Sequence, residues 1–370
     1  MENKNQYQAE LFANRLSKKY KLLKKWARRE RISCYRLYDK DIPEVPLAAD
    51  LYEFLPEEIT DKVECAKWMR EFDARISAND NSAIADQKQR TYLHLYLYER
   101  PYEKDEKEEQ EWMDLMAQAA AKVLQIPESH VIHKLRKKQK GTDQYEKIES
   151  DRTLQGLTQE CGQLFKINLS DYLDTGLFMD HRPLRSVVRA TASGKSVLNL
   201  FCYTGSFSVY AAEGKARRVE SVDLSNTYIS WAKSNLELND FNDRNKYFFT
   251  RQDVTGFLNQ KNAEVASEEG TNRYDIIILD PPTFSNSKAT TNVLDINRDW
   301  SSLCSKCIKI LKPKGILYFS TNSRRLNFEE SQLRNKTEDL DYKIEDITEQ
   351  SIPEDYKGKK IHRCWKISLL

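Results

Sequence analysis

The sequence of 370 residues has no run of about 18 apolar residues, the length needed to cross a bilayer. Its first residues, MENKNQYQAE, also lack the apolar stretch of a signal peptide. Charged residues make up 31% of the chain, a share typical of globular proteins outside membranes. We therefore expect a soluble, cytoplasmic protein with no membrane partner, and its length predicts two domains.

The residues of a disulfide framework or a metal site are missing as well. The seven cysteines are scattered and odd in number, which argues against paired disulfides. Cys304 and Cys307 form a lone CxxC motif with no second pair or histidine cluster, and the surrounding WSSLCSKCIKIL predicts a helix. We expect reduced thiols and no bound metal.

A net excess of either charge is also absent, because 59 basic residues balance 57 acidic ones and leave a net charge of +2. The basic residues are nevertheless concentrated in places. Between positions 15 and 31 nine cationic residues are opposed only by Glu30, and a second run, HKLRKKQK, covers residues 133–140. Two such blocks suit the phosphate backbone of RNA. Either block alone fits a solvated helix face equally well.

The N-terminal half predicts a small α+β unit. Residues 8–31 carry apolar side chains at helical spacing, with basic residues on the remaining faces. Short strands are predicted at 34–39, 47–55 and 91–99, the last of which alternates with period two. A second helix is expected over 103–126, where Pro127 ends it.

From about Asp171 short apolar runs alternate with helical stretches, which predicts a doubly wound α/β sheet. The polar stretch 259–273 is expected to be an exposed loop or a helix end. We place the domain boundary within 150–165, so that an RNA-binding α+β domain, 1–160, precedes a Rossmann-like domain, 161–370. The oligomeric state is not predicted. The candidate strands are SVLNLF, RVESVDL, KYFFT, YDIIILD and GILYFS.

The first of these strands leads into a candidate ligand-binding loop, 201–206, and a helix follows near Phe207. Gly205 lets the backbone approach a ligand closely, and the start of the helix offers free amides. The next strand ends in Asp223, where a carboxylate of a Rossmann unit accepts hydrogen bonds from ribose hydroxyls. This signal is weak when taken alone.

The loop has one glycine and no GxGxxG pattern, so a pyrophosphate would be poorly held. NAD and FAD are therefore disfavoured against a nucleoside ligand without phosphate, such as S-adenosylmethionine. The third strand is followed by Asp253, which is placed to meet an adenine amino group or, equally simply, to cap the next helix.

The stretch YDIIILDPPTFSNSK is the most specific in the chain. Asp280 stands at the carboxyl end of a buried strand, where open α/β sheets hold their ligands. Pro281 and Pro282 fix the backbone and remove two donors, which leaves carbonyls free to accept from a substrate. Phe284 offers a ring on which a base can stack. A rigid turn with a capping aspartate would explain Asp280 alone, but not its occurrence after the loop and Asp223.

Together, NLFCYTGSFSV, ESVDLS and ILDPPTFSNSK, with DYLDTGLFMDHR upstream and IHRCW near the end, resemble the RlmK-type guanine-N7 methyltransferases of bacterial 23S ribosomal RNA. The resemblance extends from LFANRLSKKYKLLKKWARRE to the C-terminus. In many bacteria this unit is the C-terminal half of a fused RlmKL protein, whose other half carries a THUMP domain and methylates guanine N2. Nothing here resembles that half, so we expect a stand-alone form, and what replaces the missing half in rRNA docking stays open.

The resemblance implies a class I methyltransferase fold with S-adenosyl-L-methionine as cofactor, and it places the base beside Asp280, Pro281, Pro282 and Phe284. The segment before the first core strand is implied to close over the methionine end of the cofactor; a surface helix start that pairs with acids is the alternative for His181 and Arg182. That segment contributes Thr175, Gly176, Phe178, Asp180, His181 and Arg182. Further cofactor contacts are implied at Phe201, Cys202, Tyr203, Thr204, Gly205, Ser206, Asp223, Leu224, Asp253 and Asp280.

The expected reaction is methyl transfer to guanine N7 in 23S rRNA or a large-subunit precursor. A ring nitrogen already owns a lone pair, so the reaction is mainly one of positioning and requires no nucleophilic side chain. Cytosine-C5 methylation, as in RlmI-like relatives, is the alternative enzyme, and it needs a cysteine to attack the base first. An RNA-binding protein with a degenerate methyltransferase fold is the non-enzymatic alternative.

Overall fold

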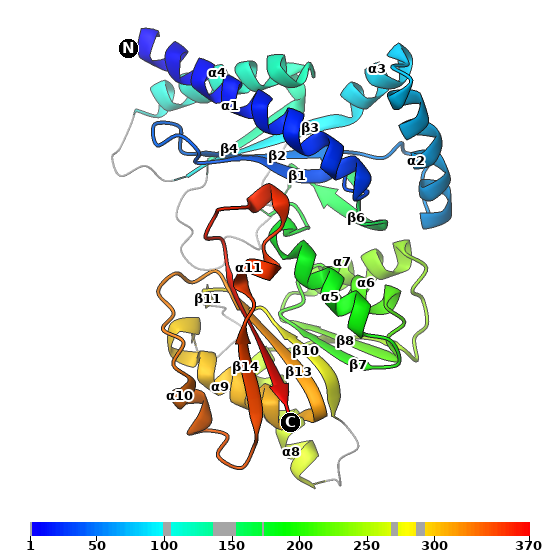
Figure 1. The fold of residues 1–370 in the computed structure, drawn as a ribbon, viewed down its shortest axis with the longest axis vertical. Helices are drawn as coiled ribbons and strands as arrows, with labels where there is room; N and C mark the ends of the chain where they lie inside the picture. The colour runs from blue at the N-terminus through cyan, green and yellow to red at the C-terminus, as the bar shows by residue number, and fades with distance from the viewer. Residues whose placement is uncertain (1, 99–104, 136–152, 172–173, 268–272, 286–292) are drawn as a thin grey trace. The chain divides into compact units, whose positions relative to one another are not determined.

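The computed structural model describes residues 2–98, 105–135, 153–171, 174–267, 273–285 and 293–370. The chain forms two compact units, Met1–Met179 and Asp180–Leu370 (Figure 1). Along the described part of the chain, no helix is both long and apolar enough to span a bilayer. Most of the basic run 133–140 lies outside the described residues.

The first unit is built on a four-stranded sheet with the order β1-β2-β3-β4. The first three strands are antiparallel neighbours, and β4 runs parallel to β3. Figure 1 shows the long helices α1 and α4 lying over this sheet, and their apolar faces share one core with it. The elements are α1 (Glu2–Arg29), β1 (Cys34–Asp39), β2 (Leu47–Glu53), β3 (Thr91–Leu97), α4 (Glu106–Leu124) and β4 (Val131–Leu135).

The helix expected over 8–31 is confirmed as α1, which begins earlier. Its residues Phe12, Leu16 and Leu23 recur at helical spacing and are fully or almost fully buried. Of the lysines between them, Lys18 and Lys21 are exposed and Lys19 is half-buried. The helix therefore attaches to the sheet by one apolar stripe and leaves a basic surface free.

Two helices that the apolar pattern did not predict lie between β2 and β3: α2 (Lys62–Ser77) and α3 (Asn81–Arg90). Each begins at an aspartate, Asp61 or Asp80, whose side chain accepts two backbone N–H groups. Few of their residues are buried, so the apolar periodicity of both helices is weak. The capping aspartates were the available signal.

A β-hairpin closes the first unit. Its strands are β5 (Gln155–Glu160) and β6 (Gln163–Asn168), and the turn residues Cys161 and Gly162 both have positive φ. Ser33 N donates to Gln159 O at 2.8 Å, and Leu55 N donates to Leu157 O at 2.8 Å. These bonds fix the hairpin to the first sheet, so the division of the chain falls after Met179 and not at residue 160, where the sequence placed it.

The second unit confirms the Rossmann-like α/β fold. Its seven-stranded sheet has the order β14-β15-β13-β10-β7-β8-β9. Strands β7, β8, β9, β10 and β13 are parallel, and β15 pairs antiparallel with β13. The strands are β7 (Ser196–Leu200), β8 (Arg218–Asp223), β9 (Tyr247–Arg251), β10 (Tyr274–Leu279), β13 (Leu311–Thr321), β14 (Tyr342–Asp346) and β15 (Arg363–Leu369).

Helices cover both faces of this sheet (Figure 1). Ile276 and Ile278 pack toward α5 and α6, whereas Ile277 and Leu279 pack toward α8 and α9. Strand β10 is thus buried on both sides, as its continuous apolar run predicts. The helices are α5 (Arg182–Thr191), α6 (Ser206–Glu213), α7 (Asn226–Leu238), α8 (Val254–Ser267), α9 (Ile296–Lys309), α10 (Glu330–Arg334) and α11 (Thr348–Ser351).

Helix α8 occupies the first part of the polar stretch 259–273, which the sequence left as a loop or helix end. Residues 268–272 of that stretch lie outside the described residues. The parallel strands β7, β8, β10 and β13 all end at one edge of the sheet, and the residues that follow them form the candidate site.

Candidate functional site

The loop after β7 is held in an unusual backbone conformation. Phe201, Tyr203 and Gly205 have positive φ angles of 53°, 50° and 76°. A Cβ at Gly205 would lie 2.8 Å from Ala232 Cβ of α7, so a side chain does not fit there. Buried Asn235 also donates to Thr204 O at 2.9 Å. The loop is therefore pressed against α7 before α6 begins.

Asp223, the last residue of β8, is attached to this loop. Its carboxylate accepts the backbone N–H of Tyr203 at 3.0 Å and that of Ser225 at 2.9 Å. Its side chain is almost completely buried, and this burial raises the pKa of Asp223 to about 6 although both amides oppose the shift. The sequence did not predict this bond between the loop and Asp223, and the ribose contact expected of Asp223 stays a prediction. The next carbonyl, that of Leu224, accepts from Arg251 Nε at 3.4 Å.

Asp253 lies at the start of α8, and its Oδ2 accepts the N–H of Gly256 at 2.8 Å. This bond is the helix cap that the sequence allowed as an alternative. One carboxylate oxygen has this role, and a contact of Asp253 with adenine stays a prediction.

Asp280 follows β10, and the side chains of Ser320 and His181 approach its carboxylate. Its Oδ1 accepts from Ser320 Oγ at 2.5 Å, and its Oδ2 lies 3.4 Å from His181 Nε2. Pro281 is buried, whereas Phe284 begins the short strand β11 (Phe284–Ser285) and is 56% exposed. The carboxylate is thus fixed at the sheet edge, with an accessible aromatic ring a few residues later.

His181 belongs to a buried chain of polar side chains. Asp180 Oδ2 lies 2.9 Å from His362 Nδ1, and the other ring nitrogen of His362 lies 2.8 Å from Ser351 Oγ. The rings of His181 and His362 stack at 4.2 Å with 14° between their planes. Burial lowers the pKa of His181, so the ring is neutral at pH 7. No sequence pattern marked Ser320 or Ser351, and His362 was marked only through the segment IHRCW.

The ligand atoms of Asp180, His181 and His362 lie within 4.8 Å of one another, which invites comparison with a metal site. The parallel stacking of the two rings prevents their in-plane lone pairs from converging on one ion. Both nitrogens of His362 are already engaged. Hydrogen bonds join Asp180, His362 and Ser351, and His181 stacks on His362. Although burial opposes it, the two histidines hold the pKa of Asp180 below its usual value.

Arg182 begins α5 and pairs with Asp355 at 2.9 Å, with both side chains almost completely buried. The alternative of a helix start that pairs with an acid therefore describes Arg182, but the pair is internal and not on the surface. Thr175 Oγ1 lies 2.8 Å from Tyr52 Oη within the first unit, where Phe178 is 42% exposed. The cofactor contacts implied for Phe178, Asp180 and Arg182 stay predictions.

Comparison with known proteins identifies the cofactor. Residues 75–332 match the family described as S-adenosylmethionine-dependent methyltransferase. A methyltransferase solved in complex with S-adenosylhomocysteine superposes with a TM-score of 0.66 at 20% identity, over 97% of this chain and 81% of that one. A methyltransferase from Streptococcus mutans gives 0.65 at 21% identity over the same shares. These solved structures support the fold.

Sequence relatives are more similar. The ribosomal RNA large subunit methyltransferase K of Neisseria meningitidis is 41% identical over 96% of this chain and 86% of its own length. The K/L protein of Pseudomonas putida is 39% identical over 98% of this chain, which spans only 42% of that longer protein. With the Rossmann-like sheet and the site at its carboxyl edge, these matches show that the chain belongs to the K and K/L group of S-adenosylmethionine-dependent methyltransferases.

Proposed function

We propose that this enzyme transfers a methyl group from S-adenosylmethionine to guanine N7 of 23S ribosomal RNA. The names of its relatives, large subunit ribosomal RNA methyltransferases K and K/L, support the rRNA substrate. The observation that supports guanine N7 as the methylated atom is the sheet edge itself, where a fixed carboxylate at Asp280 and the exposed ring of Phe284 lie, whereas the described cysteines of the second unit are all buried.

The residues fit a nucleoside cofactor without phosphate. The loop has no glycine-rich turn for a pyrophosphate, whereas Asp223 presents a carboxylate to ribose hydroxyls. When bound, S-adenosylmethionine supplies an electrophilic methyl group on its sulfonium. In this proposal the chain contributes binding and orientation: Asp223 holds the ribose, and the loop 201–206 lies beside the methionine part.

On the base side, Asp280 accepts hydrogen bonds from N–H groups of guanine, and Phe284 stacks on the ring. His181 and Ser320 keep the Asp280 carboxylate in one orientation. Guanine N7 faces a deep, narrow major groove in A-form RNA, so the base has to leave the helix before it can reach this edge. Aligning its in-plane lone pair with the methyl group is then the main task.

The cysteines disfavour cytosine-C5 methylation. Burial raises the pKa of the Cys202 thiol well above its usual value, and it does the same for Cys304 and Cys307 in α9. A buried, protonated thiol is a poor nucleophile. The neighbourhoods of Asp280 and Thr321, where a C5 enzyme would need its cysteine, contain none within two residues along the chain.

We further propose that the first unit binds the RNA through the basic surface of α1. Its lysines Lys18, Lys21 and Lys25 recur at helical spacing and are exposed. Cations in such a row suit the spacing of phosphates along a strand.

Product analysis tests the proposal. Purified enzyme, S-adenosylmethionine and 23S rRNA from cells that lack the gene are expected to yield 7-methylguanosine, which nucleoside mass spectrometry identifies. Formation of 5-methylcytidine, or of a covalent RNA adduct that depends on one cysteine, would contradict it.

A further inference from the structure

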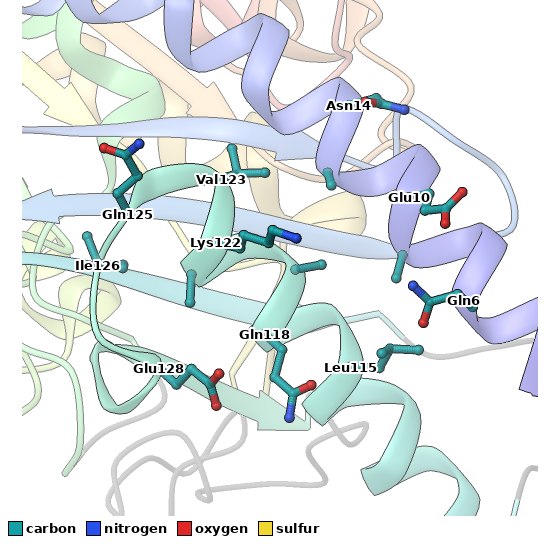
Figure 2. A pocket seen from close by; sticks show the side chains of 14 residues that line it. Gln6, Glu10, Asn14, Leu115, Gln118, Lys122, Val123, Gln125, Ile126 and Glu128 are labelled. Carbon is teal, nitrogen blue, oxygen red and sulfur yellow. The ribbon is translucent and has the colours of Figure 1, made fainter.

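Two hollows line the long helix α1 of the first unit, and they differ in charge. The first lies between the N-terminal half of α1 and α4 and has a volume of about 970 Å³. Figure 2 shows Gln6, Glu10, Gln118 and Lys122 around it, so its lining is mostly uncharged or acidic. The second has a volume of about 560 Å³ and lies beside the C-terminal half of α1, between that helix, α2 and α3. We call this second hollow the lysine groove.

The rim of the lysine groove is cationic. Lys21, Lys24 and Lys25 of α1 line it and are exposed, and Lys88 of α3 lines it from the opposite side. The three lysines of α1 form no ion pair within the described ranges of the chain, so their charges are free for a ligand. Arg28 is already paired, with Asp73 at 3.3 Å. The rim thus presents several uncompensated positive charges to an anion.

A carboxylate lies deeper in the lysine groove, at the end of β2. Glu53 Oε2 accepts from Gln87 Nε2 of α3 at 2.8 Å, which fixes the orientation of the group. Among the residues that the structure describes, none donates a hydrogen bond to Glu53 Oε1. Glu53 is partly exposed as a residue and lines the hollow, while burial raises the pKa of its carboxyl group. We infer that the second oxygen can accept from a ligand with N–H donors.

Aromatic side chains line the space between the lysines and the carboxylate. Tyr20 and Tyr35 contribute from α1 and β1, and Phe72 from α2. Lys24 Nζ lies 5.6 Å from the centre of the Tyr20 ring. Burial, together with the negative charge of Glu53, raises the pKa of the Tyr20 hydroxyl, so it stays protonated. Tyr35 and Phe72 are almost completely buried and form the floor, whereas Tyr20 is partly exposed and can meet a base. A ring beside an acceptor, below a cationic rim, matches the base and the phosphates of a nucleotide.

We propose that the lysine groove binds an unpaired guanine nucleotide of the RNA, with its Watson–Crick edge on Glu53 and its flanking phosphates on Lys21, Lys24 and Lys25. This inference rests on the proposed RNA substrate. Guanine presents two adjacent N–H donors to a carboxylate, whereas adenine and cytosine place an acceptor beside their amino group and uracil flanks its single N–H with carbonyls. The volume lies within the range of pockets for ligands of this size. An acidic peptide would meet the same lysines but would be repelled by Glu53.

The test measures binding of the full-length protein to short fluorescent oligouridylates that carry one central guanine, adenine, cytosine or no substitution. The wild-type protein is expected to bind the guanine probe about tenfold more tightly than oligouridylate, as one good base contact provides. Glu53→Gln keeps a carbonyl oxygen that can accept from Gln87. It removes the negative charge and places an NH2 donor where the second carboxylate oxygen was. It is expected to abolish the guanine preference while retaining the dependence on salt.

A double substitution of Lys21→Glu and Lys25→Glu is expected to weaken binding of all probes alike, and to reduce the slope of log affinity against log salt by about 0.7 for each lost phosphate contact. Matched controls lie in the other hollow (Figure 2), where Lys122→Glu and Glu128→Gln change the same charges. They are expected to leave the guanine preference unchanged. Thermal melting curves verify that each variant is folded.

A photocrosslink gives a second measurement that needs no substitution. A probe with 6-thioguanine at the central position is expected to crosslink to peptides that contain Tyr20, Tyr35 or Phe72, which line the lysine groove. The inference is overturned if Glu53→Gln retains the guanine preference, if the wild type shows none, or if the crosslinks fall elsewhere. Formation of 7-methylguanosine in 23S rRNA is scored separately, so loss of the lysine groove as a guanine site leaves the proposed reaction standing, and failure of methylation leaves the binding result readable.

Discussion

Two carboxylates at the same sheet edge are held in different ways. Asp223, after β8, takes its hydrogen bonds from the backbone amides of Tyr203 and Ser225. Asp280, after β10, takes its contacts from the side chains of Ser320 and His181. The first arrangement depends on backbone geometry that a side-chain change leaves in place, whereas the second can be dismantled one residue at a time. If Asp223 binds the cofactor and Asp280 the base, as proposed, the cofactor side is held by the backbone and the base side is held by side chains.

Asp223→Ala is the sharpest test of the cofactor side. The change removes the proposed acceptor for two ribose hydroxyls, and each hydrogen bond to a charged group contributes about 1.5–3 kcal/mol. We expect the affinity for S-adenosylhomocysteine to fall by roughly 100-fold or more in isothermal titration calorimetry. The fold is expected to persist, because the residue ends a strand whose apolar side chains form the core.

Asp223→Asn serves as the matched control, since it fills the same space and leaves one acceptor. It is expected to bind with intermediate affinity. If Asp223→Ala gives the wild-type titration heat, the ribose is held elsewhere and the proposed contrast between Asp223 and Asp280 fails.

His181→Ala tests the base side. Loss of the ring leaves Asp280 with Ser320 alone, so turnover on rRNA is expected to fall by about tenfold to 100-fold, as general positioning effects do. Cofactor affinity is expected to change by no more than about threefold, because the loop 201–206 and Asp223 do not contact His181 by any hydrogen bond among the described residues. Separate measurement of kcat and of the cofactor dissociation constant checks this division.

A conservative variant distinguishes positioning from bulk packing. His181→Gln supplies an amide N–H near the place of Nε2 and is expected to recover part of kcat. Ser351→Ala, at the far end of the network beyond His362, is expected to have a smaller effect. Equal losses in all three variants, or a parallel loss of cofactor affinity, would mean that the network supports the fold and not Asp280.

The difference between these two carboxylates also determined how much of the site could be predicted from the sequence. Gly205, Asp223 and Asp280 stand at strand ends in one order, so local patterns located the sheet, the loop and the carboxylates. His362 meets Asp180 across most of the second unit's sequence, and Ser320 reaches Asp280 from a neighbouring strand. Such contacts are created by folding, and one sequence has no periodicity that marks them.

Weakly apolar elements escaped for a related reason. Helix α2 buries only Cys65 and Phe72, so its sequence shows no clear apolar period. The N-capping Asp61 was the one local signal of the helix. Helices α2 and α3 form one wall of the lysine groove. Because neither helix was predicted, the groove could not be predicted either, although the lysines of α1 were recognised as a basic block. The basic residues of α1 could be located from the sequence, but the hollow that they line could not.

The pH dependence of cofactor binding sharpens the contrast further. The pKa of Asp223 is about 6 in the protein alone, above the usual value near 3.9, because the carboxylate is buried. Its ionised form is therefore disfavoured in the folded state, and this cost to stability disappears as the pH falls below 6. In the proposed binding mode ribose hydroxyls donate to the ionised carboxylate, so we expect the cofactor to compete with the proton for Asp223.

We expect the affinity for S-adenosylhomocysteine to fall by about tenfold between pH 7 and pH 5, with proton release on binding in the lower part of that range. Titrations in buffers of different ionisation enthalpy measure both quantities. Asp223→Asn cannot titrate at this position, so its affinity is expected to be nearly constant over the same interval. A wild-type affinity that does not change between pH 7 and pH 5 would refute the role of Asp223.

The smallest effect is expected at the cysteines. Cys202 lies in the cofactor loop with a buried thiol, and Cys304 and Cys307 lie inside the core on α9, so none is available to attack a base. Replacing the three by alanine removes buried sulfur and is expected to destabilise the protein by about 1 kcal/mol or more. Turnover at 25 °C is nevertheless expected to stay within a few fold of the wild type, because methyl transfer to a ring nitrogen requires alignment and no covalent intermediate. Rates of 7-methylguanosine formation, read together with melting curves, separate the two effects. A thousandfold loss of turnover in a well-folded variant with one of these cysteines replaced would contradict this expectation. It would indicate that the thiol of that cysteine attacks the base and forms a covalent intermediate.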